Sequence, residues 1–264
     1  MNLEKQGYQV SRQIIEVSEI DRMHDYLMMR LDRLREQFQE WVGEKEPLDN
    51  ERYCYHSARI SEYEQQGLPK DLRHFLTGEF DLETRLSPEI RQFMSVASLQ
   101  PALSELLGEP SYFFHYPPML RFKIPGADNT RVPPHQDIAY NSHLEKFLTI
   151  WIPFTSISDE VGGVVFYEGT QSLGNLPHGA SGAWSSRALF NEADYATFSP
   201  KMEAGDVLFF TPTIVHTSGL NLSRSGEIRL SCDVRAFNQK TISPKAYYDP
   251  FGERVYYSFE EAVK

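Results

Sequence analysis

Two histidines and one aspartate have the residue types and spacing of a metal site. His135 and Asp137 are two positions apart in the stretch 132–140. On an extended strand such side chains leave the same face, so both could contact one ion. His216, far along the chain, is the candidate third ligand. Two imidazoles and one carboxylate on one face of an iron ion leave three coordination positions open, as in non-haem Fe(II) oxygenases.

A cation and a hydroxyl follow the second histidine. Arg229 and Ser231 are two positions apart on a predicted strand. A planar guanidinium binds a carboxylate through two parallel hydrogen bonds, so the pair suits a dicarboxylate co-substrate. Arg229 follows His216 by about the length of one hairpin, so we expect the two on neighbouring strands. Arg224 is a competing candidate, but it falls in the predicted turn.

Each of these residues alone has an ordinary structural explanation. A His-x-Asp triplet is frequent on solvent-facing strands, and a single histidine or arginine is more often a packing or surface residue. Only the order and spacing of all of them together favour a metal site beside a carboxylate anchor.

The chain before about residue 110 is predicted to be largely helical. Residues 1–17 suggest a first strand. Apolar residues then recur at spacings of three and four between residues 20 and 41, which predicts a long amphipathic helix that begins after a cap at Ser18. The stretch 44–86 is weakly patterned, and we interpret it as a substrate lid. Two short helices are expected before residue 108.

The remainder of the chain has the pattern of short strands separated by turns. The predicted strands are 111–116, 118–124, 132–140, 146–153, 163–168, 206–211, 213–218, 226–237 and 253–258. Many short strands behind a helical part indicate a barrel or jelly roll flanked by helices. We therefore expect one domain over 1–264, with a helical part to about 110 and a jelly-roll core over about 111–240.

Composition narrows the class of protein. Acidic residues outnumber basic ones by 37 to 26, for a net charge of −11, which disfavours nucleic-acid and anionic-membrane partners. Only Cys54 and Cys232 are present, so no disulfide framework is expected. We find neither a signal-peptide pattern nor an apolar run of about 20 residues. We expect a cytoplasmic protein with a small-molecule substrate, and its oligomeric state stays open.

The sequence resembles the phytanoyl-CoA dioxygenase family of Fe(II)/2-oxoglutarate-dependent oxygenases. Five motifs carry the resemblance: PHQD at 134–137, LTIWIP at 148–153, GGVVFYEGTQ at 162–171, HTSGLNLS at 216–223 and IRLS at 228–231. The resemblance implies a mostly β fold, a cupin-like double-stranded β-helix with helices packed on one side. At 168–171 the chain departs from the Pro-Gly-Ser-His turn common in the family.

The resemblance also implies roles for individual residues. The catalytic iron ligands would be His135, Asp137 and His216. The residues contacting 2-oxoglutarate would be Arg229, Ser231, Thr149 and Lys123. Arg121 is a further candidate for either the co-substrate or the substrate. Four residues are candidates to line the substrate pocket: Tyr140, Trp151, Asp233 and Arg235.

The implied reaction consumes 2-oxoglutarate and O2, hydroxylates a C–H bond and releases succinate and CO2. Asp137 stands where related halogenases have a small residue, so halogenation is disfavoured. Desaturation or ring formation stays open. The acidic charge and the lack of a Lys/Arg cluster for a CoA tail favour a small polar metabolite or natural-product intermediate.

Three other classes of protein remain as alternatives. One is a cupin-like metalloenzyme, an isomerase or hydrolase that does not use 2-oxoglutarate. This alternative does not explain the Arg229 and Ser231 pair. A non-catalytic sensor or binding module leaves the retention of all three ligands unexplained. An interaction protein built on the long helix is not favoured by that helix's simple apolar stripe.

Overall fold

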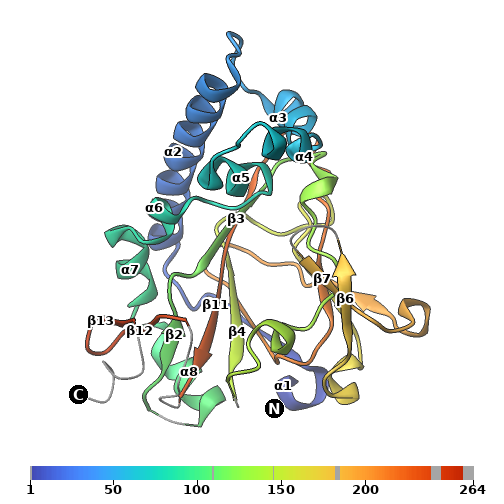
Figure 1. Ribbon diagram of the computed structural model, residues 1–264. Coiled ribbons are helices and arrows are strands. Elements are labelled where there is room, and N and C mark those ends of the chain that lie inside the picture. The colour runs from blue at the N-terminus through green and yellow to red at the C-terminus, as the bar shows by residue number, and fades with distance from the viewer. Residues whose placement is uncertain (1, 109, 145, 182–184, 239–244, 258–264) are drawn as a thin grey trace.

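The computed structural model describes residues 2–108, 110–144, 146–181, 185–238 and 245–257. A large antiparallel sheet lies at the centre of the molecule (Figure 1). Its path follows the order β1 (Tyr8–Ser11), β9 (Val207–Phe210), β4 (Leu148–Pro153), β11 (Arg229–Phe237), β2 (Phe113–His115), β12 (Tyr247–Asp249) and β13 (Arg254–Tyr256), and β3 (Met119–Lys123) also pairs with β11.

A second, smaller sheet faces the first. It has the order β10 (His216–Ser218), β5 (Val164–Tyr167) and β8 (Thr197–Phe198), and all its pairings are antiparallel. A separate hairpin, β6 (His178–Ser181) and β7 (Ser185–Ala188), lies on the side of the sheets away from α2 (Val17–Val42) (Figure 1). Two antiparallel sheets face to face behind helices form the expected jelly-roll core. The fold class is therefore confirmed.

Alternation along the central strands separates a helical side from an inner side. On β11, Leu230, Cys232, Val234 and Ala236 belong to the same apolar cluster as α2. Arg229, Ser231, Asp233 and Arg235 occupy the alternate positions, and their side chains therefore point to the other face. One strand thus buries its apolar half against helices and presents four polar side chains to the space between the sheets.

The helical layer covers the outer face of the large sheet. The helices are α1 (Asn2–Gln6), α2, α3 (Asn50–Ser57), α4 (Ile60–Gln65), α5 (Lys70–Leu76), α6 (Leu82–Arg85), α7 (Pro88–Met94) and α8 (Leu99–Leu107). Short 3-10 turns span Asp128–Thr130, Asp137–Tyr140, Thr170–Leu173 and Glu192–Asp194. None of the helices in the described ranges is long and apolar enough to cross a membrane.

The region expected to be irregular is instead largely helical. Over 44–86 the chain forms α3 to α6, each too short for a clear apolar period, and two of them have aspartate caps, at Asp49 and Asp81. The long helix also begins differently from the prediction. Glu16 occupies its N-cap position and makes no side-chain cap, while Ser18 already lies within the helix.

Two predictions about the strands around the site are wrong. The stretch 132–140 is no strand: it makes one bridge, between His135 and His216, and turns into a 3-10 helix at Asp137. Consecutive prolines at 133 and 134 cannot donate to a ladder, which explains the interruption. β10 and β11 are not hairpin neighbours either, because they belong to different sheets.

Candidate active site

Three buried side chains converge between the sheets. The ligand atoms of His135, Asp137 and His216 all lie within 4.8 Å of one another. The two histidines are aligned by their backbones, since His135 and His216 exchange N–H···O bonds of 2.9 and 3.0 Å. Asp137 follows two residues later, at the start of a 3-10 helix, and its Oδ1 lies 3.7 Å from His135 Nε2. A strand is therefore not needed to place His135 and Asp137 together.

Backbone carbonyls orient both imidazoles. His135 Nδ1 lies 2.9 Å from the carbonyl oxygen of Pro133, and His216 Nδ1 lies 3.1 Å from that of Ile214. A carbonyl can only accept, so each Nδ1 carries a proton and each Nε2 is left to face the cluster. Burial lowers the pKa of His216 to about 3, which keeps that ring neutral. His216 is thus in the form that binds a metal.

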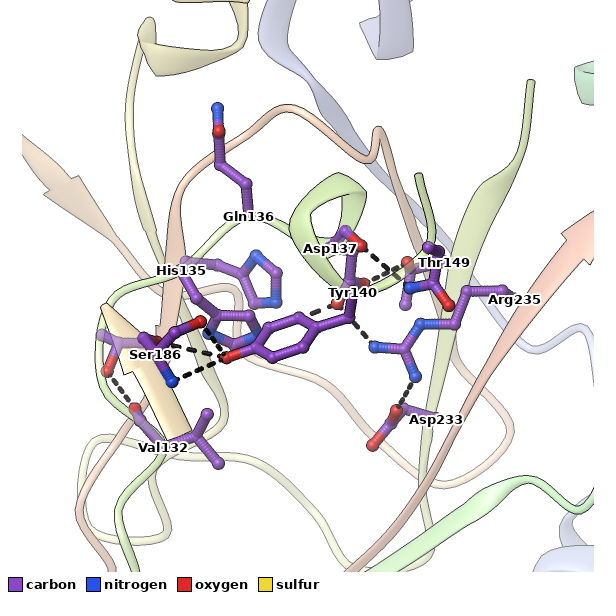
Figure 2. Close-up of polar contacts among 12 residues, drawn as sticks. Val132, His135, Gln136, Asp137, Tyr140, Thr149, Ser186, Asp233 and Arg235 are labelled. Atoms are coloured by element: carbon purple, nitrogen blue, oxygen red, sulfur yellow. Dashed lines mark hydrogen bonds and ion pairs between the residues drawn. The ribbon is translucent and has the colours of Figure 1, made fainter. Parts of the chain in front are cut away.

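The carboxylate of Asp137 is held from both sides (Figure 2). Thr149 Oγ1 donates to Oδ2, and Arg235 Nη2 lies 2.5 Å from Oδ1. Burial alone would favour the neutral acid, but the Arg235 guanidinium outweighs it and holds the pKa of Asp137 well below its usual range. The third ligand is therefore ionised and fixed in orientation.

Arg235 is one member of a chain of ion pairs. Its Nη1 lies 2.6 Å from Asp233 Oδ1, so the guanidinium bridges the two aspartates (Figure 2). Asp233 Oδ2 in turn lies 3.1 Å from Arg121 Nε, and Arg121 pairs with Glu79. Antiparallel pairing of β11 with β3 and a bridge between Glu79 and Arg121 set this order. The chain links the metal-ligand carboxylate to the helical layer.

A small inner cavity of about 60 Å³ touches both the three ligands and Arg229. Arg229 is buried, and its guanidinium donates to the carbonyl oxygens of Gly162 and Gly163. Its Nε has no hydrogen-bond partner among the described residues, and it forms no ion pair with any of them. Burial accordingly lowers its pKa to about 9. A buried cation without a counter-ion is costly, and an anion in this cavity would relieve the cost.

A larger outer cavity of about 440 Å³ shares His135 and Asp137 with the inner one. This volume is in the range of small-molecule sites. Its other polar and charged lining residues are Glu79, Arg85, His115, Arg121, Tyr140, Asn141, Asp233, Arg235 and Lys245, and its apolar lining includes Pro117, Pro118, Met119, Val132, Val234 and Ala246. The site therefore has a small inner cavity with charged walls and a larger outer cavity whose lining is partly apolar.

Comparison with known proteins identifies the family of this chain. The sequence profile described as phytanoyl-CoA dioxygenase (PhyH) matches residues 3–230, which is most of the chain. This chain belongs to the phytanoyl-CoA dioxygenase family. The expected family is thus confirmed, and with it a set of relatives that includes hydroxylases.

Two curated relatives match over part of their length. A 1-deoxypentalenic acid 11-beta-hydroxylase of Streptomyces exfoliatus is 28% identical over 167 residues, covering 55% of this chain and 58% of the relative. A probable phytanoyl-CoA dioxygenase of Caenorhabditis elegans is 28% identical over 157 residues, covering 55% and 50%. The chain thus spans about half the length of these relatives.

Solved structures share the fold. EvdO2 from Micromonospora carbonacea var. aurantiaca, complexed with 2-oxoglutarate, superposes with a TM-score of 0.53 at 17% identity, over 89% of this chain and 87% of that one. At this identity the likeness establishes the fold alone.

The structure distributes the predicted cofactor residues between several places. Thr149 lines the inner cavity and bonds to Asp137. Ser231 lies two positions from Arg229 on the same face of β11, and its buried hydroxyl has no partner within the described residues. Lys123 lies apart from both cavities and donates to the carbonyl oxygen of Thr130. Because its ammonium is engaged there and outside both cavities, its position does not favour a contact with 2-oxoglutarate.

The predicted substrate residues are also divided between the outer and the inner cavity. Tyr140 lines the outer cavity, where its hydroxyl bonds to Ser186 of β7 (Figure 2). Asp233 and Arg235 line both cavities but are engaged in ion pairs with each other. Trp151 lines only the inner cavity, with Arg229 6.0 Å from its ring centroid.

Sequence reasoning missed three charged residues of the outer cavity, Glu79, Arg85 and Lys245. Glu79 and Arg85 lie in the stretch that was expected to be irregular. No motif marks them, and they come to the cavity only because the chain after α5 runs alongside β3.

Proposed function

We propose that this chain is a non-haem Fe(II)/2-oxoglutarate-dependent oxygenase that hydroxylates a C–H bond of a small metabolite or natural-product intermediate. The observation that carries the proposal is the buried Arg229, which has no anionic partner among the described residues and shares a 60 Å³ cavity with a two-histidine, one-carboxylate cluster. A metal alone would not need this arginine, whereas a dicarboxylate that also ligates the metal would.

The residues present fit both absent groups. His135, Asp137 and His216 would hold Fe(II), and two imidazoles with an ionised carboxylate match its preference. Arg229 would bind the distal carboxylate of 2-oxoglutarate, with Ser231 as a further donor beside it. When bound, Fe(II) and 2-oxoglutarate supply an oxidant made from O2, with succinate and CO2 as products.

The chain's own side chains position these groups. The carbonyls of Pro133 and Ile214 fix which nitrogen of each imidazole faces the centre. Thr149 and Arg235 hold the carboxylate of Asp137 so that it does not rotate. Apolar residues, including Trp151, Val164 and Phe210, line the inner cavity and limit access of water to it. Preorganised ligands of this kind avoid reorganisation during the reaction.

The outer cavity is the place for the substrate, because it opens onto His135 and Asp137. The Streptomyces relative's name describes hydroxylation of a small organic acid, which supports hydroxylation here. A single-domain organisation over 1–264 is supported by the apolar cluster that α2 and β11 share. A cytoplasmic location stays a prediction, supported by the free thiols of Cys54 and Cys232.

The test is an anaerobic titration of Fe(II)-loaded protein with 2-oxoglutarate, monitored by the weak visible charge-transfer band of chelation. We expect the band in the wild type and in His24→Ala, which removes a histidine on α2 away from the site. We expect no band in His216→Ala. If the wild type gives no band, the oxygenase proposal fails and a cupin-like metal isomerase or hydrolase takes its place.

A further inference from the structure

Arg85 differs from the other arginines of the outer cavity in its partners. It ends α6, and its Nε donates to the carbonyl oxygen of Pro118 at 2.8 Å. Its Nη2 lies 3.0 Å from Met119 Sδ, and a thioether is only a weak acceptor. Within the described ranges it forms no ion pair. Arg85 therefore reaches the cavity with one edge of its guanidinium poorly satisfied.

Each acid that lines this cavity is paired with an arginine other than Arg85. Glu79 pairs with Arg121, and Asp233 lies between Arg121 and Arg235. Arg235 also pairs with Asp137. Arg85 is therefore the one arginine lining this cavity that forms no ion pair within the described residues.

Partial burial makes a guanidinium without an ion-pair partner costly. Desolvation lowers the pKa of Arg85, and Glu79, the acid that most opposes this shift, is already shared by Arg121 and His74. A guanidinium remains charged at neutral pH, so Arg85 does not escape this desolvation cost by losing its proton. A ligand that supplies one negative charge would relieve it.

The cavity beside Arg85 selects the rest of the ligand. Pro117, Pro118, Met119 and Ala246 give it an apolar lining. One open guanidinium edge matches a planar, singly charged carboxylate, whereas a phosphate dianion normally requires several donors. The volume of about 440 Å³ accommodates a metabolite of modest size.

We propose that Arg85 is a substrate-binding residue and that the substrate is a small carboxylic acid with an apolar body, held so that its far end reaches the metal ligands. This inference rests on the proposed oxygenase function for the fate of the acid, but not for its binding. The acid is distinct from 2-oxoglutarate, which would occupy the inner cavity at Arg229.

The experiment measures binding of 4-phenylbutanoate by calorimetry, with its neutral amide as the matched probe. It is performed anaerobically on Fe(II)-loaded protein with saturating 2-oxoglutarate, so that Arg229 is already occupied, and repeated on the metal-free protein. We expect the acid to bind at least tenfold more tightly than the amide. Excess 2-oxoglutarate should not displace it.

Substitutions assign the effect to one residue. Arg85→Gln should weaken binding of the acid at least tenfold and leave binding of the amide unchanged. Arg85→Lys should restore part of the affinity because it keeps the charge. Arg33→Gln, at an exposed arginine of α2, is the control and should bind the acid as the wild type does. The amide also reports whether the Arg85→Gln cavity is still formed.

Three results would overturn the inference: equal affinities for acid and amide, acid binding that survives Arg85→Gln, or no binding of the acid at all. Each of these can occur while the chelation band forms normally, in which case the oxygenase proposal stands and the carboxylate site falls. Conversely, Arg85-dependent binding of the acid without a chelation band would support the carboxylate site and overturn the oxygenase proposal.

Discussion

Arg235 Nη2 lies 2.5 Å from Asp137 Oδ1, which makes the proposed metal-ligand carboxylate one end of a buried chain of ion pairs. The same guanidinium holds Asp233, which reaches Glu79 through Arg121. Glu79 in turn pairs with His74 of α5. The chain couples the geometry of the metal site to packing of the helices on the sheet. Its members consequently affect stability and metal binding together.

Replacing Arg235 by Met should destabilise the metal-free protein. The change leaves Asp137 and Asp233 buried without their shared cation, and breaking a buried pair from one side costs about 3–5 kcal/mol. Urea unfolding followed by circular dichroism measures the loss. Adding Asp233→Asn to Arg235→Met should recover part of it, because it removes a buried charge that has lost one of its two arginine partners. A single variant as stable as the wild type would contradict the role given to this chain.

Replacing Thr149 by Val should weaken metal binding with little effect on the fold. Valine has the shape of threonine but cannot donate to Asp137 Oδ2, so the carboxylate loses one of its two restraints. Removing such a supporting contact typically costs about 10–100-fold in metal affinity. Anaerobic titration with Co(II), followed by its visible spectrum, gives the affinity. Thr149→Ser keeps the hydroxyl and should bind Co(II) nearly as the wild type does.

Replacing Arg229 by Ala should sharply raise the 2-oxoglutarate concentration needed for chelation. Loss of one partner of a buried charge pair costs about 2–5 kcal/mol, which corresponds to roughly 30-fold or more in affinity. Co(II) affinity should stay within about threefold, because Arg229 contacts the backbone carbonyls of Gly162 and Gly163 rather than a ligand. Unchanged 2-oxoglutarate affinity would move the anchor away from Arg229. Arg224→Ala, at an exposed position, serves as the control.

Glu79 should contribute stability that is lost in acid. Burial raises the pKa of this carboxyl, but Arg121 and His74 outweigh it and lower the pKa from 4.5 to about 2. A depressed carboxyl pKa stabilises the fold above the unfolded value, and the contribution disappears as pH falls from about 4.5 towards 2. Its size is roughly 3 kcal/mol.

Urea midpoints between pH 7 and pH 2.5 test this prediction. Glu79→Gln should lower stability at pH 7 and flatten its dependence on pH below 4.5, while Glu36→Gln, at an exposed site on α2, should follow the wild type. A wild-type and a Glu79→Gln profile that run parallel through this range would show that Glu79 does not supply the effect.

Much of the site could be predicted from the sequence because its residues lie in local patterns. The period of two along β11 puts Arg229 and Ser231 on one face whatever the surrounding fold, and the apolar stripe of α2 is equally local. The His-x-Asp spacing and the motifs around it were sufficient to predict the family, and the family match confirms it. These are statements about neighbours in the chain.

Only the tertiary structure decided which residues far apart in the sequence come into contact. The pairing of His135 with His216 depends on a single bridge, and the prolines before His135 prevent the strand that its sequence pattern predicted. The register of β11 against β3 sets Arg121 beside Asp233, and the packing of α6 brings Arg85 to the cavity. Charges far apart in sequence carry no periodic signal, because their partners are chosen by sheet register and helix packing.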